Sequence, residues 1–119
     1  MLSWNGQAAS ARAIKSAMPF ARQAKRVLVL EHEGSEINRS RLEHFLGNHD
    51  VRPEAWHAYG DKSLTARGRA RALLAAARAE DGDLLVMGAY GDPGERLFRF
   101  GRATEKVASA ARIPVLFSC

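Results

Sequence analysis

Three glycines after an apolar run form the pattern in this sequence that is best suited to chemistry. Gly88 directly follows the apolar residues 84–87, Gly91 comes three positions later, and Gly101 follows after nine intervening residues. Glycine lets the backbone approach an anion closely and permits positive φ, so that successive N–H groups can converge. A helix that begins after Gly101 would add free N–H groups and the positive end of its dipole. The spacing therefore predicts a phosphate-holding loop, with ordinary turn glycines as the alternative.

Continuous apolar runs predict the strands that must position this loop. Runs without polar alternation are typical of parallel strands that helices cover on both faces. The predicted strands are residues 1–4, 27–30, 55–59, 84–87 and 115–117. Ligands bind such sheets at the carboxyl ends of the strands, and Gly88 falls at one of these ends.

Helical patterns alternate with these strands. They are expected over residues 7–25, 37–46, 63–80 and 102–111. Pro19 should bend the first helix, Gly47 and Asn48 should end the second, and Ser63 should cap the third. The alternation predicts an α/β protein with an open five-stranded parallel sheet, helices on both faces and right-handed crossovers.

Length, charge and cysteine content limit the classes of protein. The 119 residues suffice for one domain, so we expect residues 1–119 to form a single domain. No apolar run reaches membrane-spanning length and no signal-peptide pattern is present, which makes the cytoplasm the expected location. The net charge of +5 comes from arginines and lysines spread along the chain, which favours a solvated surface over nucleic-acid binding. With Cys119 as the only cysteine, we expect no disulfide and no metal centre.

No arrangement of residues in the sequence predicts catalysis. The chain has neither a Gly-x-Ser-x-Gly nucleophile motif nor a Gly-Lys-Ser/Thr phosphate loop. Glu31, Glu33 and Glu36 are close together, but a solvated loop explains them more simply than an acid–base pair. We therefore expect a protein that is not an enzyme.

Four segments carry a resemblance to a known family: Trp4-Asn-Gly6, residues 83–91, Gly101, and Pro114-Val-Leu. They resemble the universal stress protein family, and the resemblance covers essentially the whole chain. The pattern Gly-x2-Gly-x9-Gly, followed by Ser or Thr, is that family's ATP-binding signature. The resemblance implies a five-stranded parallel sheet in the order 3-2-1-4-5, of the adenine nucleotide alpha hydrolase-like type. It also implies ATP as a regulatory ligand, with Mg²⁺ only when ATP is bound.

The family motif, carried onto this sequence, predicts seven nucleotide-binding residues. They are Asn5, Met87, Gly88, Gly91, Gly101, Arg102 and Ala103. Two of them depart from the family pattern, since Asn5 replaces an Asp and Arg102 replaces the Ser or Thr. Arg102 could bind phosphate, fill the site, or turn outward to solvent. The alternative function is that of the nucleotide-free members, which act as dimeric protein-interaction modules with partners that the sequence does not identify.

The two ends of the chain give further expectations. Val115, Leu116 and Phe117 should form an apolar edge strand, and such an edge favours pairing with another chain. We therefore predict a homodimer through the last strand, in line with the family. Met1 lies only a few residues before the first turn, which leaves the central strand short. We expect preceding sequence to be missing, or the chain to be the second half of a tandem protein.

Overall fold

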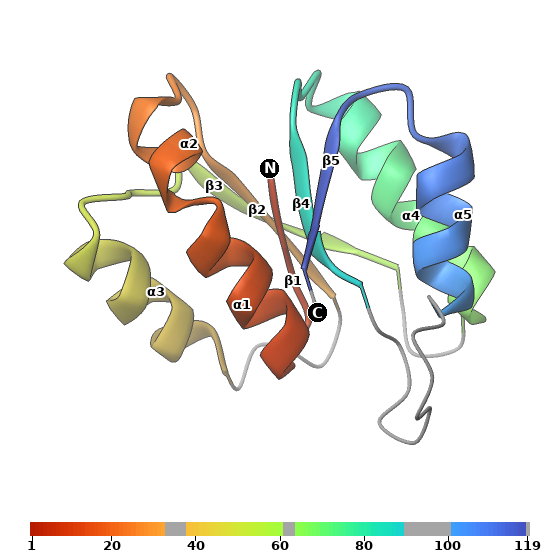
Figure 1. Cartoon of the computed structure of the whole chain (residues 1–119), viewed down its shortest axis with the longest axis horizontal. Coiled ribbons are helices and arrows are strands. Elements are labelled where there is room, and N and C mark those ends of the chain that lie inside the picture. The colour runs from red at the N-terminus through yellow and green to blue at the C-terminus, as the bar shows by residue number, and fades with distance from the viewer. Residues whose placement is uncertain (33–37, 61–63, 90–100, 119) are drawn as a thin grey trace.

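The strands form one parallel sheet. The computed structural model describes residues 1–32, 38–60, 64–89 and 101–118. The strands are β1 (Leu2–Trp4), β2 (Leu28–His32), β3 (Ala55–Tyr59), β4 (Leu85–Gly88) and β5 (Val115–Ser118). All neighbours pair in parallel, in the order β3-β2-β1-β4-β5 (Figure 1). This order confirms the predicted fold class, and β3 has the bounds that the sequence predicted.

Helices cover both faces of the sheet. They are α1 (Ala8–Ser16), α2 (Met18–Gln23), α3 (Arg39–Asn48), α4 (Ala66–Ala79) and α5 (Arg102–Ala110). The first three lie on one face, whereas α4 and α5 lie together on the other (Figure 1). The sheet therefore separates two hydrophobic cores.

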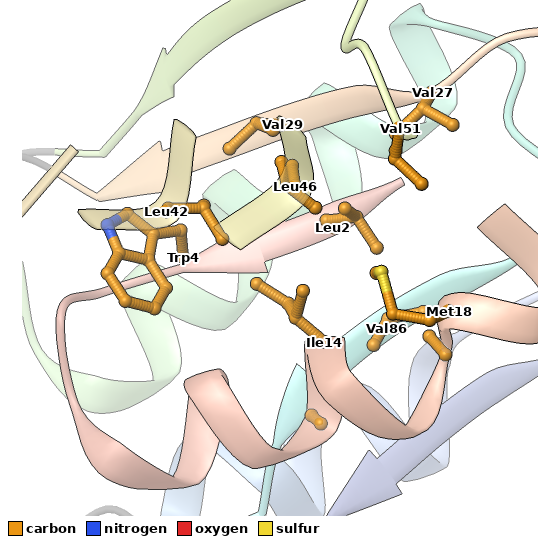
Figure 2. Packing of buried hydrophobic residues seen from close by; sticks show 12 residues of the cluster. Leu2, Trp4, Ile14, Met18, Val27, Val29, Leu42, Leu46, Val51 and Val86 are labelled. Carbon is orange, nitrogen blue, oxygen red and sulfur yellow. The ribbon is translucent and has the colours of Figure 1, made fainter. Parts of the chain in front are cut away.

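The central strand β1 contributes to both faces because successive side chains of a strand point to opposite sides. Leu2 and Trp4 belong to the core under α1 to α3 (Figure 2). Ser3, between them, lies on the other face, where its hydroxyl is 3.3 Å from the hydroxyl of Tyr59. One polar residue in an otherwise apolar strand thus faces the cavity described below.

The first helical pattern is interrupted near Pro19, as predicted. Ala17 is the C-cap of α1 and also the N-cap of α2, and Pro19 lies in the first turn of α2. Proline is tolerated there because the first N–H groups of a helix have no intrahelical partner.

Two predicted helix boundaries are wrong. The second helix does not stop after Leu46 but includes Gly47 and ends at Asn48, and the chain turns away at Asp50, which takes the left-handed conformation with φ 58°. The N–H of Val51 then reaches back to the carbonyl of Leu46 at 2.9 Å. The cap of α4 is Thr65, whose hydroxyl accepts the N–H of Gly68 at 3.1 Å. Ser63, the predicted cap, lies outside the described residues.

Candidate functional site

A cavity of about 320 Å³ opens at the carboxyl ends of the strands, between β1, β4 and the helices α4 and α5. Four of the predicted nucleotide-binding residues line it: Asn5, Met87, Gly88 and Ala103. Gly101 lies next to it as the N-cap of α5, while Arg102 is exposed and is not part of its lining. Gly91 lies outside the described residues. The structure therefore brings four predicted residues together around one cavity.

Asn5 uses its side-chain oxygen within the protein. Its Oδ1 accepts the backbone N–H of Gln7 at 3.0 Å and the hydroxyl of Ser10 at 2.8 Å. Ser10 is buried, and its Oγ is also 2.8 Å from the carbonyl oxygen of Gln7, so its single proton is shared between two acceptors. The amide nitrogen of Asn5 is thus the group that remains for a ligand. It is a donor, whereas the aspartate of the family pattern can only accept.

Gly88 is required by the packing of α1 against β4. A Cβ at this position would lie 2.7 Å from the backbone nitrogen of Ser10 and 2.8 Å from the carbonyl carbon of Ala9. The positive φ that glycine permits is not used here, since the described glycines with positive φ are Gly6 and Gly60. Gly88 therefore allows a close approach of backbone to backbone, in addition to any approach of a ligand.

The amino end of α5 faces this cavity without a side-chain cap. Gly101 is its N-cap, and the first helical bond runs from Glu105 N–H to the carbonyl of Gly101. The N–H groups of the three residues between them have no intrahelical acceptor, and this end of the helix dipole is positive. Thr104 is buried and its hydroxyl donates to the carbonyl oxygen of Ala89 at 2.6 Å. That bond fixes the first turn of α5 against the end of β4.

A polar wall opposite α5 comes from β1, β2, β3 and α4. The ring edge of His32 packs on Tyr59, with centroids 5.6 Å apart. Burial raises the pKa of the Tyr59 hydroxyl, and the hydrogen bond with Ser3 and the charge of Arg69 oppose this only in part. Arg69 donates to the carbonyl oxygen of Leu64 at 3.1 Å and also lines the cavity. No Asp or Glu is part of the lining formed by the described residues, so the cavity suits an anion.

Several lining residues were not predicted from the sequence. They are Ser3, Gln7, Ser10, His32, Tyr59, Arg69, Ala70, Leu73, Thr104 and Val107. The inward position of Thr104 could have been predicted, because it lies three positions before the core residue Val107 and so shares its face of the helix. Tyr59 is the last residue of β3, at the same sheet edge as Gly88. The side of α4 on which Arg69 lies depends on the exact start of that helix, which the sequence pattern did not give.

The described residues offer neither a cluster of metal ligands nor a membrane-spanning helix. No group of three or more His, Cys, Asp or Glu side chains there could hold a metal ion. Among the same residues, no helix is long and apolar enough to cross a membrane.

Known proteins share the fold of this chain, and a family model matches its sequence. Solved structures with the same fold include the hypothetical protein MJ0577, which is the subject of a structure-based assignment of biochemical function. Its TM-score is 0.66 and its sequence identity is 15%, and the match covers 98% of this chain and 92% of that chain. Another is the universal stress protein UspA from Lactobacillus plantarum, with TM-score 0.66 and 14% identity over 99% of this chain and 94% of that one. No curated protein matches the sequence significantly. The sequence model of the universal stress protein family matches residues 7–118. The chain therefore belongs to the universal stress protein family.

Proposed function

We propose that this chain binds an adenine nucleotide, ATP, in the cavity at the carboxyl ends of β1 and β4. The observation that carries the proposal is the combination of two features: the described residues of the lining include no carboxylate, and the amino end of α5 has no side-chain cap. Together they offer main-chain donors and positive potential at the strand ends, where open α/β sheets bind their ligands. Membership of the universal stress protein family adds the Gly88-x2-Gly91-x9-Gly101 signature that the sequence carries.

In this proposal the two ends of the ligand meet different groups. The phosphates lie against Gly88, Gly101 and the first N–H groups of α5, and Gly91 belongs to the same loop in the sequence. The adenosine lies beside Met87 and Asn5, where the amide nitrogen of Asn5 can donate to a ribose oxygen. Arg102 is exposed, so it leaves the cavity open to the ligand. Mg²⁺ accompanies ATP, because the described lining has no carboxylates to bind the metal alone.

ATP acts here as a regulatory ligand, and we propose no catalytic role for the protein. Hydrolysis needs a group that activates water. The titratable side chains of the described lining are His32, Tyr59 and Arg69. Burial raises the pKa of the Tyr59 hydroxyl above its ordinary value of 10.0, so this side chain is neutral near pH 7. The ring of His32 packs on Tyr59, and no Asp or Glu of the described lining lies beside it to act as a general base.

Arg69 and Arg71 provide a matched test on one helix. Arg69 lines the cavity, whereas Arg71, two residues later on α4, is exposed. Titration calorimetry with Mg²⁺ and ATP should show that Arg69→Ala weakens binding about tenfold, the effect expected for losing one charged contact. Arg71→Ala should leave the affinity unchanged.

Gly91→Val should abolish binding without unfolding the protein. Absence of ATP binding by the unmodified protein would reject the proposal.

The second candidate is a nucleotide-free, dimeric protein-interaction module. The observation that favours it is β5, which pairs with β4 on one side only within the described strands and carries the apolar residues Val115, Leu116 and Phe117. A dimer that neither binds ATP nor gains thermal stability from it would support this candidate over the first. Its partner class is a protein, bound through the sheet edge or the dimer surface.

A further inference from the structure

A second, larger cavity lies on the opposite face of the sheet, between α1 and α3. Its volume is about 500 Å³, against about 320 Å³ for the cavity at β4 and α5. Trp4, Leu42 and Phe45 give it an apolar floor. A volume of this size with mostly apolar walls is typical of sites for small organic ligands.

The rim of this α1–α3 cavity is positively charged. Arg12 and Lys15 of α1 and Arg41 of α3 line it, and no Asp or Glu is part of its lining in the described residues. Both helices begin at this cavity, with no side-chain cap and no acidic residue in the first turn. Their dipoles therefore add to the charge of the three basic side chains. An anionic group is the complement of such a rim.

The one buried carboxylate among the described residues does not reverse this charge. Glu31 pairs in register with Trp4, and its side chain is almost fully buried. Arg39 binds both of its carboxylate oxygens, with Nε to Oε2 at 3.0 Å, and lies over the ring of Trp56. The Glu31–Arg39 pair is thus neutral as a unit, and it leaves the charges of Lys15 and Arg41 at the rim.

Trp4 adds a polar group without a partner to the apolar floor. The residue is 5% exposed, and its indole N–H has no hydrogen-bond acceptor among the described residues. Figure 2 shows the ring at the edge of the buried cluster, beside Leu42. A buried donor is nearly always paired in a folded protein. An acceptor atom on a bound ligand would give the indole N–H of Trp4 a hydrogen-bond partner.

We propose that the α1–α3 cavity binds an amphipathic organic anion, with an apolar, aromatic body and one anionic head. The body packs on Trp4, Leu42 and Phe45, and a small shift of the ring brings the indole N–H to an acceptor of the ligand. The head pairs with Lys15 and Arg41 at the rim. This site is separate from the proposed ATP site, because the two cavities share only Gln7 among their described lining residues.

The test uses anilinonaphthalene sulfonate, an aromatic anion whose fluorescence rises in apolar surroundings, and its neutral analogue phenylnaphthylamine. The anion should bind saturably and accept excitation energy from Trp4 in a Trp56→Phe background. The neutral analogue should bind at least about tenfold more weakly, as expected for the loss of charged contacts. Cooperative thermal unfolding of each protein sample excludes dye binding to a loosened state.

Matched variants locate the bound probe. Lys15→Ala combined with Arg41→Ala should weaken binding about tenfold, whereas the pair Arg67→Ala and Arg71→Ala on α4 removes the same charge and should change nothing. Ala11 is exposed and lines the cavity, so Ala11→Trp should fill it and abolish binding, with Ala11→Ser as the control. Equal binding of the neutral analogue, displacement of the probe by ATP, or unchanged binding to Ala11→Trp would each overturn the proposal.

Discussion

The hydroxyl of Thr104 donates a 2.6 Å hydrogen bond to the carbonyl oxygen of Ala89, which links the first turn of α5 to the residue after β4. The N–H of Ala89 is already bonded to Ser118 at 2.8 Å, so Thr104 provides the partner of the remaining polar group. Thr104→Val keeps the shape of the side chain but leaves a buried acceptor unsatisfied. We expect it to lower the free energy of unfolding by about 1–3 kcal/mol in urea denaturation.

Thr104→Ser is the control for this bond, since it keeps the hydroxyl and removes one methyl group. It should retain most of the stability that Thr104→Val loses. ATP affinity should follow the same order, because the bond holds the amino end of α5 at the proposed phosphate position. Equal stability of the two variants would show that the hydrogen bond has no net effect.

Gly88→Ala should destabilise the protein through α1 rather than through a ligand. The new Cβ would meet backbone atoms of Ser10 and Ala9 at 2.7 and 2.8 Å, and backbone cannot move aside as a flexible side chain can. Overpacking of this kind costs about 1–3 kcal/mol, measurable as a lower urea midpoint. Gly47→Ala is the matched control.

A Cβ at Gly47 meets nothing within 4 Å, and Gly47 lies inside α3. Its replacement by alanine should therefore stabilise the protein by about 0.5–1 kcal/mol. An unchanged midpoint for Gly88→Ala would show that α1 can move away from β4 at no cost. Because Gly88→Ala perturbs packing, a loss of ATP binding in this variant would not by itself identify a phosphate contact.

Tyr59 should make stability fall at alkaline pH. Its pKa is raised above 10.0 in the folded protein because the hydroxyl is buried. Above pH 10 the unfolded state releases this proton while the folded state retains it, so the free energy of unfolding decreases as pH rises toward the folded pKa. Tyr59→Phe should lower stability at neutral pH by about 0.5–1.5 kcal/mol, through loss of the hydrogen bond with Ser3.

The difference in urea midpoint between wild type and Tyr59→Phe isolates this effect, because lysines titrate in the same range and contribute to both proteins. The difference should shrink as pH rises above about 10, the ordinary pKa of tyrosine. A difference that stays constant from neutral to alkaline pH would contradict the raised pKa of Tyr59.

Strands could be predicted from the sequence more accurately than helix ends. An apolar run such as Leu85–Gly88 needs burial on both faces, and few other structures provide it. Helix ends depend on single residues that compete for the cap. Asp50 could take the left-handed conformation, so Gly47 was not needed to end α3. Thr65 forms the cap of α4, and the sequence does not rank it above Ser63.

The residues of the candidate site that could be predicted from the sequence lie at the ends of strands. Asn5, Met87 and Gly88 lie at strand ends, and their meeting at one sheet edge follows from the parallel order. Arg69 and Thr104 come from helices, where a shift of one residue rotates a side chain by about 100°. Their contribution to the cavity depends on how α4 and α5 pack on the sheet, and the sequence pattern does not determine that packing.

Val115→Pro tests the predicted homodimer through β5. The carbonyls of Pro114 and Ser118 accept hydrogen bonds from Leu85 and from Ala89, the residue after β4. Backbone groups alternate in direction along a strand, so the N–H of Val115 points away from β4. Proline at this first residue of β5 should therefore remove a donor to a neighbouring chain and no bond to β4. Light scattering should show a dimer for wild type and Val115→Ala, and a shift toward monomer for Val115→Pro. A wild-type monomer at all concentrations would contradict pairing through this edge.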